Sequence, residues 1–288
     1  MANPDVTSFF DEQTNTVSYV VTCPETQTSA IVDSVLNYDL HSGRTSTASA
    51  EEIITFLDYN GLTASWILET HVHADHLSAA SFLKAKTGAK VAIGEHISAV
   101  QDIFGKLFNA GEAFTHDGRQ FDQLFSNDDT FKIGNLNATA IHTPGHTPAC
   151  MSYLIGDTVF VGDTLFMPDY GTARADFPGG DARTLYKSIQ RLFELPAETR
   201  VFLCHDYLAP GRTEHAWETT IAAQKKHNVH VHDGVSEDDF VKMRETRDAT
   251  LDLPRLILPS VQVNMRAGEL PPPESNGQRY LKIPIDAL

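Results

Sequence analysis

The hydrophobic pattern of the chain changes its period several times. Residues 16–23 and 28–36 alternate apolar and polar positions, which is typical of β-strands, and the turn-forming residues between them indicate a hairpin. Residues 49–60 instead repeat apolar positions at helical spacing. Glu51 near the start and Gly61 at the end favour a helix with these limits. The chain therefore begins with strands and continues into a helix.

Strands and helices alternate over the rest of the chain. From about residue 211 the pattern is mainly helical, and the chain ends in a proline-rich stretch. We expect a core over residues 1–210 and a helical extension over residues 211–288 that packs on the same domain. The order of the elements predicts an α+β fold of two mixed β-sheets flanked by helices. We expect a buried strand that runs into a loop at 64–73, a short strand at 89–94, and strand-rich stretches with Gly and Asn turns at 129–146, 149–166 and 199–207. The expected helices lie at 76–88, 96–111, 180–196 and 214–228.

Composition and charge narrow the class of protein. At 288 residues and 41% hydrophobic, the chain can build a large core without disulfides. A net charge of −16 argues against binding to nucleic acid or to an anionic membrane, because both need a basic surface. The three cysteines are not closely paired, which indicates free thiols in a reducing compartment. No secretory signal is visible and no apolar run approaches the ~20 residues of a membrane helix, so we expect a cytoplasmic enzyme.

Potential metal ligands are concentrated in the stretch "HVHADH" at residues 71–76, which follows an apolar strand. His71 and His73 are two positions apart and share one face of an extended segment. Asp75 and His76 follow once the chain has turned. A polar turn with Asp75 as a helix cap is the simpler explanation for any one of these residues. Three histidines and an aspartate at this spacing favour a metal site.

Three further stretches place histidine or aspartate at the ends of predicted strands. His146 lies beside a Pro-Gly turn, Asp163 follows an apolar strand, and His205 and Asp206 follow another. Each could be a turn or core residue if it stood alone. Side chains from several strand ends that converge on one pocket are typical of a catalytic site.

These stretches together resemble the metallo-β-lactamase superfamily. The matching segments are "THVHADH", "TPGHT", "VGDTLF" and "CHDY", in this order, and they cover roughly residues 15–210. The resemblance implies an αββα sandwich with metal bound at one edge of the two sheets.

Within the superfamily, the chain is most similar to the persulfide dioxygenase group, in its bacterial, stand-alone form. The segment Arg174-Ala175-Asp176-Phe177 resembles an Arg-Thr-Asp-Phe run of that group, with Ala175 in place of the threonine. The stretch "HTPAC" resembles its histidine motif. The stretch "LPSVQVNMRAG" resembles its Asn-Met-Arg-Cys-Gly tail, with Ala267 in place of the cysteine. Glyoxalase II, the other group considered, lacks this tail.

The resemblance to persulfide dioxygenases implies one Fe(II) per subunit in a site with open positions for substrate and O₂. The glyoxalase II alternative implies two zinc ions held by the same residues, with Asp163 between them. Residue spacing leaves both schemes open. In the iron scheme the metal ligands and catalytic residues are His71, His146 and Asp163, and His73, Asp75, His76 and His205 support them through hydrogen bonds.

The reaction implied is the oxidation of glutathione persulfide (GSSH) with O₂ and water to sulfite and glutathione, as part of sulfide metabolism. Arg174 and Arg266 are expected to bind the glutathione carboxylates, and Tyr207 and Met265 to line the pocket. The alternatives are a glyoxalase II-like zinc hydrolase of glutathione thioesters and a non-catalytic iron or persulfide sensor. We expect a homodimer, because this is the commonest symmetric assembly.

Overall fold

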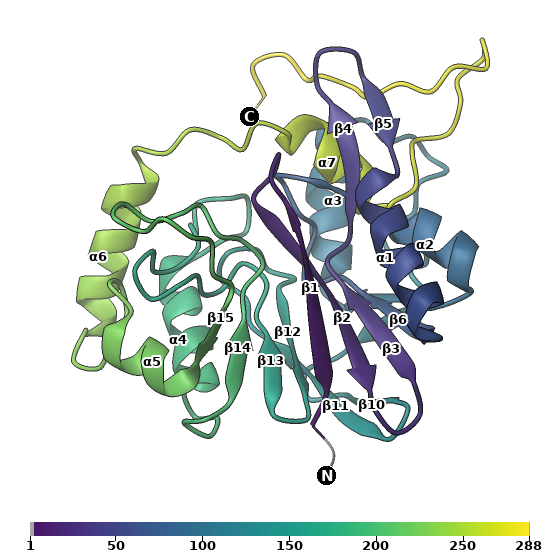
Figure 1. The fold of residues 1–288 in the computed structure, drawn as a ribbon. Coiled ribbons are helices and arrows are strands. Elements are labelled where there is room, and N and C mark those ends of the chain that lie inside the picture. The colour runs from purple at the N-terminus through teal and green to yellow at the C-terminus, as the bar shows by residue number, and fades with distance from the viewer. Residues whose placement is uncertain (1–2, 288) are drawn as a thin grey trace.

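Two six-stranded sheets form the centre of the protein, as the computed structural model of residues 3–287 shows (Figure 1). The first sheet has the order β1 (Asp5–Asp11), β2 (Thr16–Cys23), β3 (Thr28–Val32), β6 (Thr63–Leu68), β8 (Lys90–Gly94) and β9 (Gln123–Phe125). Its first three strands pair antiparallel and the others parallel. The sheet is therefore mixed, as the sequence predicts.

The second sheet is also mixed. It has the order β10 (Thr130–Ile133), β11 (Leu136–His142), β12 (Met151–Ile155), β13 (Thr158–Phe160), β14 (Arg200–Phe202) and β15 (Glu218–Thr220). Only β13 and β14 pair in parallel. A small third sheet contains β5 (Arg44–Ser46), β4 (Val35–Asp39) and β7 (Leu77–Ser78).

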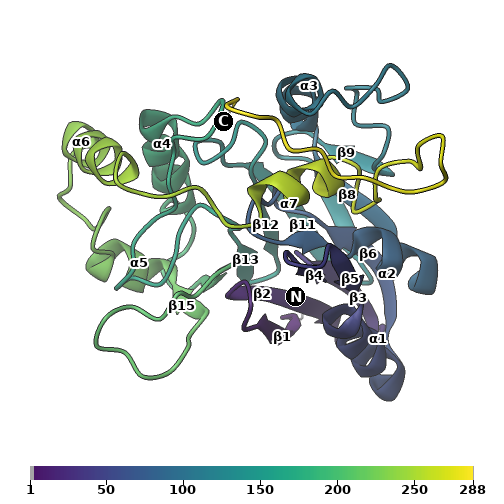
Figure 2. The same ribbon diagram turned by 90° about the horizontal axis from the view of Figure 1, so that it is seen from above.

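Helices cover the outer faces of both large sheets. One group lies on the side of the first sheet and contains α1 (Ala48–Asn60), α2 (Ala80–Thr87), α3 (Ile97–Leu107) and α7 (Ile257–Asn264). The other lies on the side of the second sheet and contains α4 (Ala182–Leu192), α5 (Ile221–His227) and α6 (Glu237–Asp248). Figure 2 shows the same two groups from above. None of the helices in residues 3–287 is long and apolar enough to cross a membrane.

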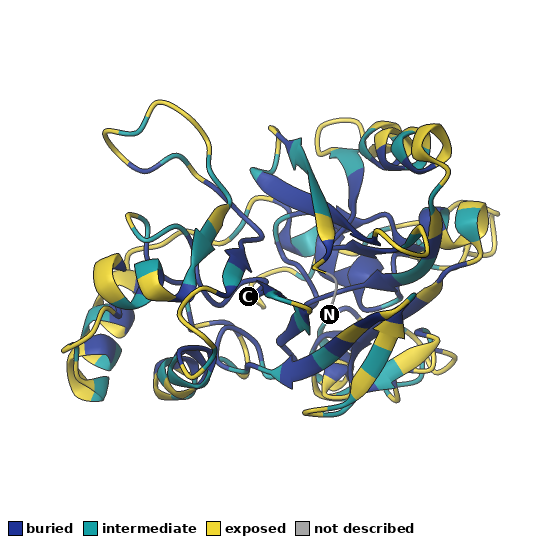
Figure 3. Ribbon diagram, turned by 60° about the horizontal axis from the view of Figure 1, so that its bottom comes forward, coloured by how far each residue is buried: buried dark blue, intermediate teal, exposed yellow. Residues whose placement is uncertain are grey.

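The packing of the strands follows from their period of two. In β2, Val17, Tyr19 and Val21 contribute to a core between the two sheets, while Val20 belongs to the core under the first group of helices. Both faces of this strand are thus buried, and Figure 3 shows buried strands between helices with exposed outer faces. The result is the αββα arrangement that the resemblance implies, which confirms the predicted fold class.

The C-terminal extension contributes to both outer cores. Val261 and Val263 of α7 pack with the first sheet, and Phe240 of α6 packs with the second. Within α6, Arg244 forms a buried ion pair with Asp248. The same guanidinium donates to the Thr172 carbonyl at 3.1 Å, and this contact also fixes the extension. Residues 211–288 therefore pack on the rest of the chain through a shared hydrophobic core.

Among the predicted elements whose limits differ in the structure, three differ for a clear physical reason. The stretch 28–36 is not one strand, because the chain turns at Asp33 (φ 49°) and divides it into β3 and β4. The helix expected over 76–88 begins only at residue 80, since residues 77–78 pair with β4. The helix expected over 214–228 begins only at Ile221, because residues 218–220 pair with β14. In each case strand pairing or burial in the folded protein outweighs the local hydrophobic pattern of the sequence.

Candidate metal centre

The seven residues predicted for the metal site meet at one edge of the two large sheets. Residues 71–76, which we call the histidine loop, follow β6 of the first sheet. His146 lies between β11 and β12, Asp163 follows β13, and His205 follows β14. Because β13 and β14 are parallel neighbours, Asp163 and His205 leave the second sheet at the same edge. A single β-bridge from Thr16 to His205 connects that edge to the first sheet.

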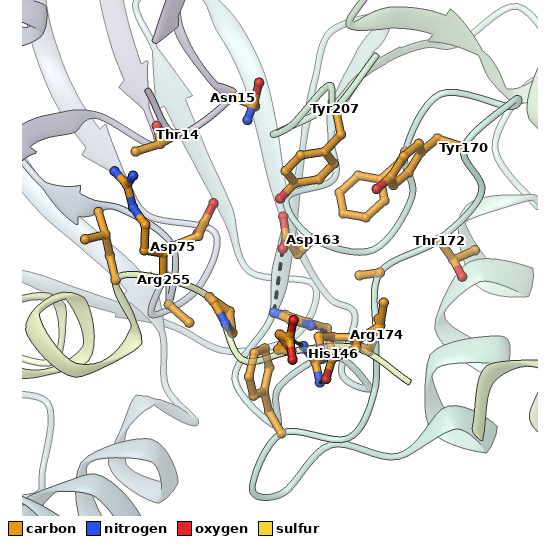
Figure 4. A pocket seen from close by; sticks show the side chains of 18 of the residues that line it. Thr14, Asn15, Asp75, His146, Asp163, Tyr170, Thr172, Arg174, Tyr207 and Arg255 are labelled. Carbon is orange, nitrogen blue, oxygen red and sulfur yellow. Dashed lines mark hydrogen bonds and ion pairs between the residues drawn. The ribbon is translucent and has the colours of Figure 1, made fainter. Parts of the chain in front are cut away.

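His71, His146 and Asp163 form the first ligand group, with one potential ligand atom of each within 4.8 Å of the others. Nε2 of His146 is 3.7 Å from Oδ2 of Asp163, and Figure 4 shows these two side chains pointing toward each other. Nδ1 of His146 is bonded to the Arg174 carbonyl at 2.8 Å, and Nδ1 of His71 lies 3.0 Å from Oγ1 of Thr70. These contacts leave Nε2 of both histidines for the centre of the group.

His73, Asp75, His76 and His205 form the second ligand group, again with potential ligand atoms within 4.8 Å of one another. Nε2 of His205 lies 3.1 Å from Oδ2 of Asp75 and 3.2 Å from Oδ1 of Asp163. Asp163 therefore contacts both groups. The structure places together all seven side chains on which both metal schemes depend.

Buried polar atoms without hydrogen-bond partners test whether this cluster fits a metal. Such atoms are costly in a protein interior, and a metal ion satisfies them. In the first group, Nε2 of His71 lacks a partner among the described residues, and Oδ1 of Asp163 has only the ion pair with His205. In the second group Nδ1 of His73 and Nε2 of His76 also lack a partner among these residues. Nε2 of His205 and Oδ2 of Asp75 form no regular hydrogen bond and have only their mutual ion pair and that of His205 with Asp163. Nitrogen and oxygen donors in both groups fit Fe(II) or Zn²⁺.

The electrostatics of the cluster also suit a cation. Burial, together with the neighbouring histidines, lowers the pKa of His71 well below its usual value, so the imidazole is neutral and can act as a ligand. Burial alone would lower the pKa of His205, but Asp75 and Asp163 outweigh it and raise the pKa to about 9. The two carboxylates thus draw positive charge to this position.

Asp33 is a supporting residue that the sequence analysis missed. Its carboxylate accepts hydrogen bonds from the amide and the hydroxyl of Thr70 at 2.8 and 2.9 Å, and lies 2.9 Å from Nε2 of His73. Burial would raise the pKa of Asp33, but the charge and hydrogen bond of His73 outweigh it and lower the pKa. The only signal in the sequence was a carboxylate that interrupts an apolar run. The contact orients His73 with Nδ1 toward the second ligand group.

Asn264 is a second residue that the sequence analysis did not assign. It is the last residue of α7, and its amide donates to the carbonyls of His73 at 2.9 Å and His76 at 2.8 Å. Its side-chain oxygen accepts from the amide of Ser78 at 2.7 Å. Asn264 thereby fixes both ends of the turn in the histidine loop from the C-terminal extension.

A cavity of about 420 Å³ opens beside the cluster (Figure 4). His146, Asp163 and Asp75 reach it from the metal side. Phe166, Tyr170 and Tyr207 line another wall, and the ring of Tyr207 stacks on His205 with 5.5 Å between ring centroids. Tyr207 thus lies in the wall of this cavity, and its contact with a substrate stays a prediction.

Arg174 also lines the cavity, but its charge is already paired. Nε and Nη2 donate to the two carboxylate oxygens of Asp176 at 2.6 and 2.8 Å, and Nη1 donates to the Asp252 carbonyl at 2.6 Å. The guanidinium also lies 5.0 Å from the centre of the Phe177 ring. Asp176 and Phe177, which follow Arg174 in the segment 174–177, thus hold its side chain in place.

Met265 and Arg266 do not line this cavity. Met265 is fully buried in the core under the first group of helices. The Arg266 guanidinium lies 4.1 Å from the centre of the Phe114 ring and borders a separate, smaller cavity beneath the proline-rich tail. The geometry therefore gives no support to a glutathione contact by either residue, because α7 points Asn264 rather than its two successors toward the histidine loop.

Cys150 and Cys204 are buried near the cluster. Burial raises the pKa of the Cys150 thiol to about 12, with Asp163 adding to the shift, so this residue behaves as a small apolar side chain. Burial and Asp33 raise the pKa of Cys204 well above its usual value.

Comparisons with known proteins agree with this geometry. The family model described as "Metallo-beta-lactamase superfamily" matches residues 13–205. A "Probable metallo-hydrolase" of Burkholderia pseudomallei is 57% identical, covering 98% of this chain and 99% of that protein. "Glyoxylase B2" of Dictyostelium discoideum is 50% identical, covering 100% of this chain and 99% of that protein.

Similarity to persulfide dioxygenases is more distant. The crystal structure of ETHE1 from Myxococcus xanthus superimposes with a TM-score of 0.73 at 30% identity, covering 92% of this chain and 100% of that one. "Persulfide dioxygenase ETHE1, mitochondrial" of Mus musculus is 26% identical, covering 92% of this chain and 89% of that protein. With its two-sheet fold, its cluster of histidines and aspartates and the match over residues 13–205, the chain belongs to the metallo-β-lactamase superfamily.

Proposed function

We propose that this protein is a persulfide dioxygenase. It converts glutathione persulfide, O₂ and one water into glutathione, sulfite and two protons. The sulfur–sulfur bond breaks, the terminal sulfur is oxidised, and O₂ is reduced by the electrons of that sulfur. The likeness to Myxococcus xanthus ETHE1, which extends over the whole of that structure, is the observation that carries this proposal.

In this proposal His71, His146 and Asp163 hold one Fe(II), as a two-histidine, one-carboxylate triad with open positions. Iron bound there supplies the redox chemistry by which O₂ reacts with the terminal sulfur of the persulfide. The protein orients the ligands, since the Arg174 carbonyl fixes the ring of His146 and Thr70 that of His71. His73, Asp75, His76 and His205 support the triad from the adjoining group.

The cavity beside the triad would bind the substrate. A persulfide is more acidic than a thiol and reaches the site as an anion, so its terminal sulfur is attracted to the metal side of the cavity. Phe166, Tyr170 and Tyr207 exclude water from the neighbouring wall. Arg174, which is paired with Asp176, keeps the adjoining loop in place through the Asp252 carbonyl.

A second candidate function is supported by the unpaired atoms of the second ligand group. Nδ1 of His73 and Nε2 of His76 are buried without partners among the described residues, and together with Asp75 and His205 they fit a second metal ion as well as the first group fits one. A binuclear zinc hydrolase of glutathione thioesters would use them, and the 50% identity to "Glyoxylase B2" favours this alternative.

Metal analysis of the protein purified under anaerobic conditions separates the two functions. We expect one Fe per chain, with O₂ consumption and sulfite release when glutathione persulfide is added. About two Zn per chain, with hydrolysis of S-lactoylglutathione and no O₂ uptake, would replace the dioxygenase with the hydrolase.

A further inference from the structure

Four arginines supply the positive charge of the cavity, and two of them are already neutralised. Arg174 is paired with Asp176, as described above. Arg244 is buried and donates to Asp248 at 2.6 and 2.8 Å. These two ion pairs build the wall of the cavity, and their charges are not free for a ligand.

The other two arginines have no such partner. Arg247 lies in the last turn of α6 and Arg255 lies just before α7, and both line the cavity with exposed side chains. Within residues 3–287, neither guanidinium forms an ion pair or a hydrogen bond. Asp252 lies between them and also lines the cavity, and its carboxylate is likewise unpaired. Residues 247–255 thus present two free positive charges and one free negative charge.

The segment 247–255 is held in place by buried contacts. The Asp248 carboxylate accepts from the amide of Ala175 at 2.9 Å, which joins the end of α6 to the loop that carries Arg174. Arg174 in turn donates to the Asp252 carbonyl, so the middle of the segment is fixed while its carboxylate stays free. Figure 4 shows Arg255 and Arg174 on different sides of Asp163 and His146. The segment that carries the three unpaired charges is therefore fixed at the cavity by hydrogen bonds.

We infer that residues 247–255 recognise the peptide part of glutathione, with Arg247 and Arg255 binding its two carboxylates and Asp252 binding its ammonium group. The inference rests on the proposed function for the choice of glutathione. Two carboxylates and one ammonium are the charges of glutathione, and they complement the free charges of the segment one for one. Arginine suits this task because its planar donors match both oxygens of a carboxylate. The alternative is that these charges face only solvent, where an exposed pair contributes little.

Direct binding of S-methylglutathione, measured by titration calorimetry on the metal-loaded enzyme, tests the inference without any turnover. Arg247→Ala and Arg255→Ala should each weaken binding at least tenfold, which equals about 1.4 kcal/mol. The matched control is Arg119→Ala, since Arg119 is exposed, is paired with Asp117 and lies outside the cavity. The control should bind like the wild type. Wild-type affinity in both cavity variants would overturn the inference.

Modified ligands assign each charge. The glycyl ethyl ester of S-methylglutathione should bind the wild type at least tenfold more weakly than the parent does. In one of the two arginine variants ester and parent should bind alike, because their shared partner is gone. N-acetylation should weaken binding to the wild type but not to Asp252→Asn. If every variant discriminates these ligands as the wild type does, the charges of residues 247–255 face only solvent and the inference fails.

Kinetics separate this inference from the proposed function. With glutathione persulfide, the arginine variants should raise KM far more than they lower kcat, because the contacts lie away from the reacting sulfur. If the wild type consumes no O₂ but the binding pattern holds, the dioxygenase proposal fails and the recognition site stands. If O₂ is consumed and the variants bind normally, the dioxygenase stands and the recognition site fails.

Discussion

Asn264 connects the C-terminal extension to the histidine loop, and its replacement by alanine is a direct test of how the metal centre is held. The side chain is buried and makes three hydrogen bonds, two to carbonyls of the loop and one from the amide of Ser78. No other side chain bonds the carbonyl oxygens of His73 and His76 among the hydrogen bonds of residues 3–287. Asn264→Ala leaves all three backbone groups buried and unpaired.

The expected cost follows from those three groups. Each buried backbone group left without a partner costs about 1–3 kcal/mol, so the three together should lower the free energy of unfolding by roughly 3–9 kcal/mol. This is a large share of the total for a domain, which is about 5–15 kcal/mol. The loop would also lose the turn that aims four potential ligands, and loss of a supporting contact typically weakens metal binding about 10–100-fold.

Two measurements are needed, namely urea unfolding and metal affinity from competition with a chelator at a temperature where the variant is folded. Gln262→Ala is the matched control, because Gln262 lies in the same helix and bonds Leu258 and Lys282 rather than the loop. The control should lose stability but keep its metal affinity. Asn264→Ala should lose both.

Asn264→Asp gives the sharpest contrast, since aspartate has nearly the same shape. It keeps an acceptor for Ser78 but places a carboxylate oxygen against two carbonyl oxygens, so it should be at least as damaging as alanine. If the aspartate variant binds metal with wild-type affinity, the side chain only fills space and the reasoning is refuted.

Three further predictions concern the triad, the cavity and the pH response. Asp163→Ala should abolish iron retention because the variant removes the carboxylate of the triad, and full iron occupancy by elemental analysis would contradict this. Arg174→Ala should raise KM for glutathione persulfide more than it changes iron content, as it releases the Asp252 loop; an unchanged KM would separate Arg174 from substrate binding. Burial, with Arg244 and Arg247, lowers the pKa of His230 to about 4 from an ordinary value of about 6.5, so the unfolded state binds more protons between these values. The contribution of His230 to the free energy of unfolding is complete above pH 6.5 and is lost as the pH falls toward 4. This loss is at most about 3 kcal/mol before solvent screening. The free energy of unfolding of His230→Asn, measured in urea, should therefore fall less over this pH range than that of the wild type.

The environment of His230 depends on residues that are distant in the sequence. This residue lies in a polar stretch with His227 and His232, and both of these neighbours are exposed. His230 instead accepts a hydrogen bond from the amide of Thr172 at 3.0 Å, and it packs so closely against Gly171 that a side chain there would collide with the ring. The partner is 58 residues away in the sequence. No local pattern carries that information.

The sequence by itself determined the fold class and pointed to the seven residues that the fold brings together. Alternating strands buried on both faces require a covering layer on each side, which leads to two sheets between helices. Strand ends that carry His71–His76, His146, Asp163 and His205 then deliver ligands to a common edge. Both features are local in origin, because a strand's period and the residue at its end are written in adjacent positions.

The tertiary structure alone decided what supports and surrounds that cluster. Asp33 and Asn264 reach the histidine loop across 40 and 191 residues of chain, measured to His73. Only the fold shows that Arg174 is neutralised by Asp176 while Arg247 and Arg255 remain free, and that Arg266 faces Phe114 instead of the cavity. The physical reason is that an arginine has the same sequence signature whether or not a carboxylate faces it. Its partner is chosen by packing between distant elements, and that choice decides which charges are left to bind a ligand.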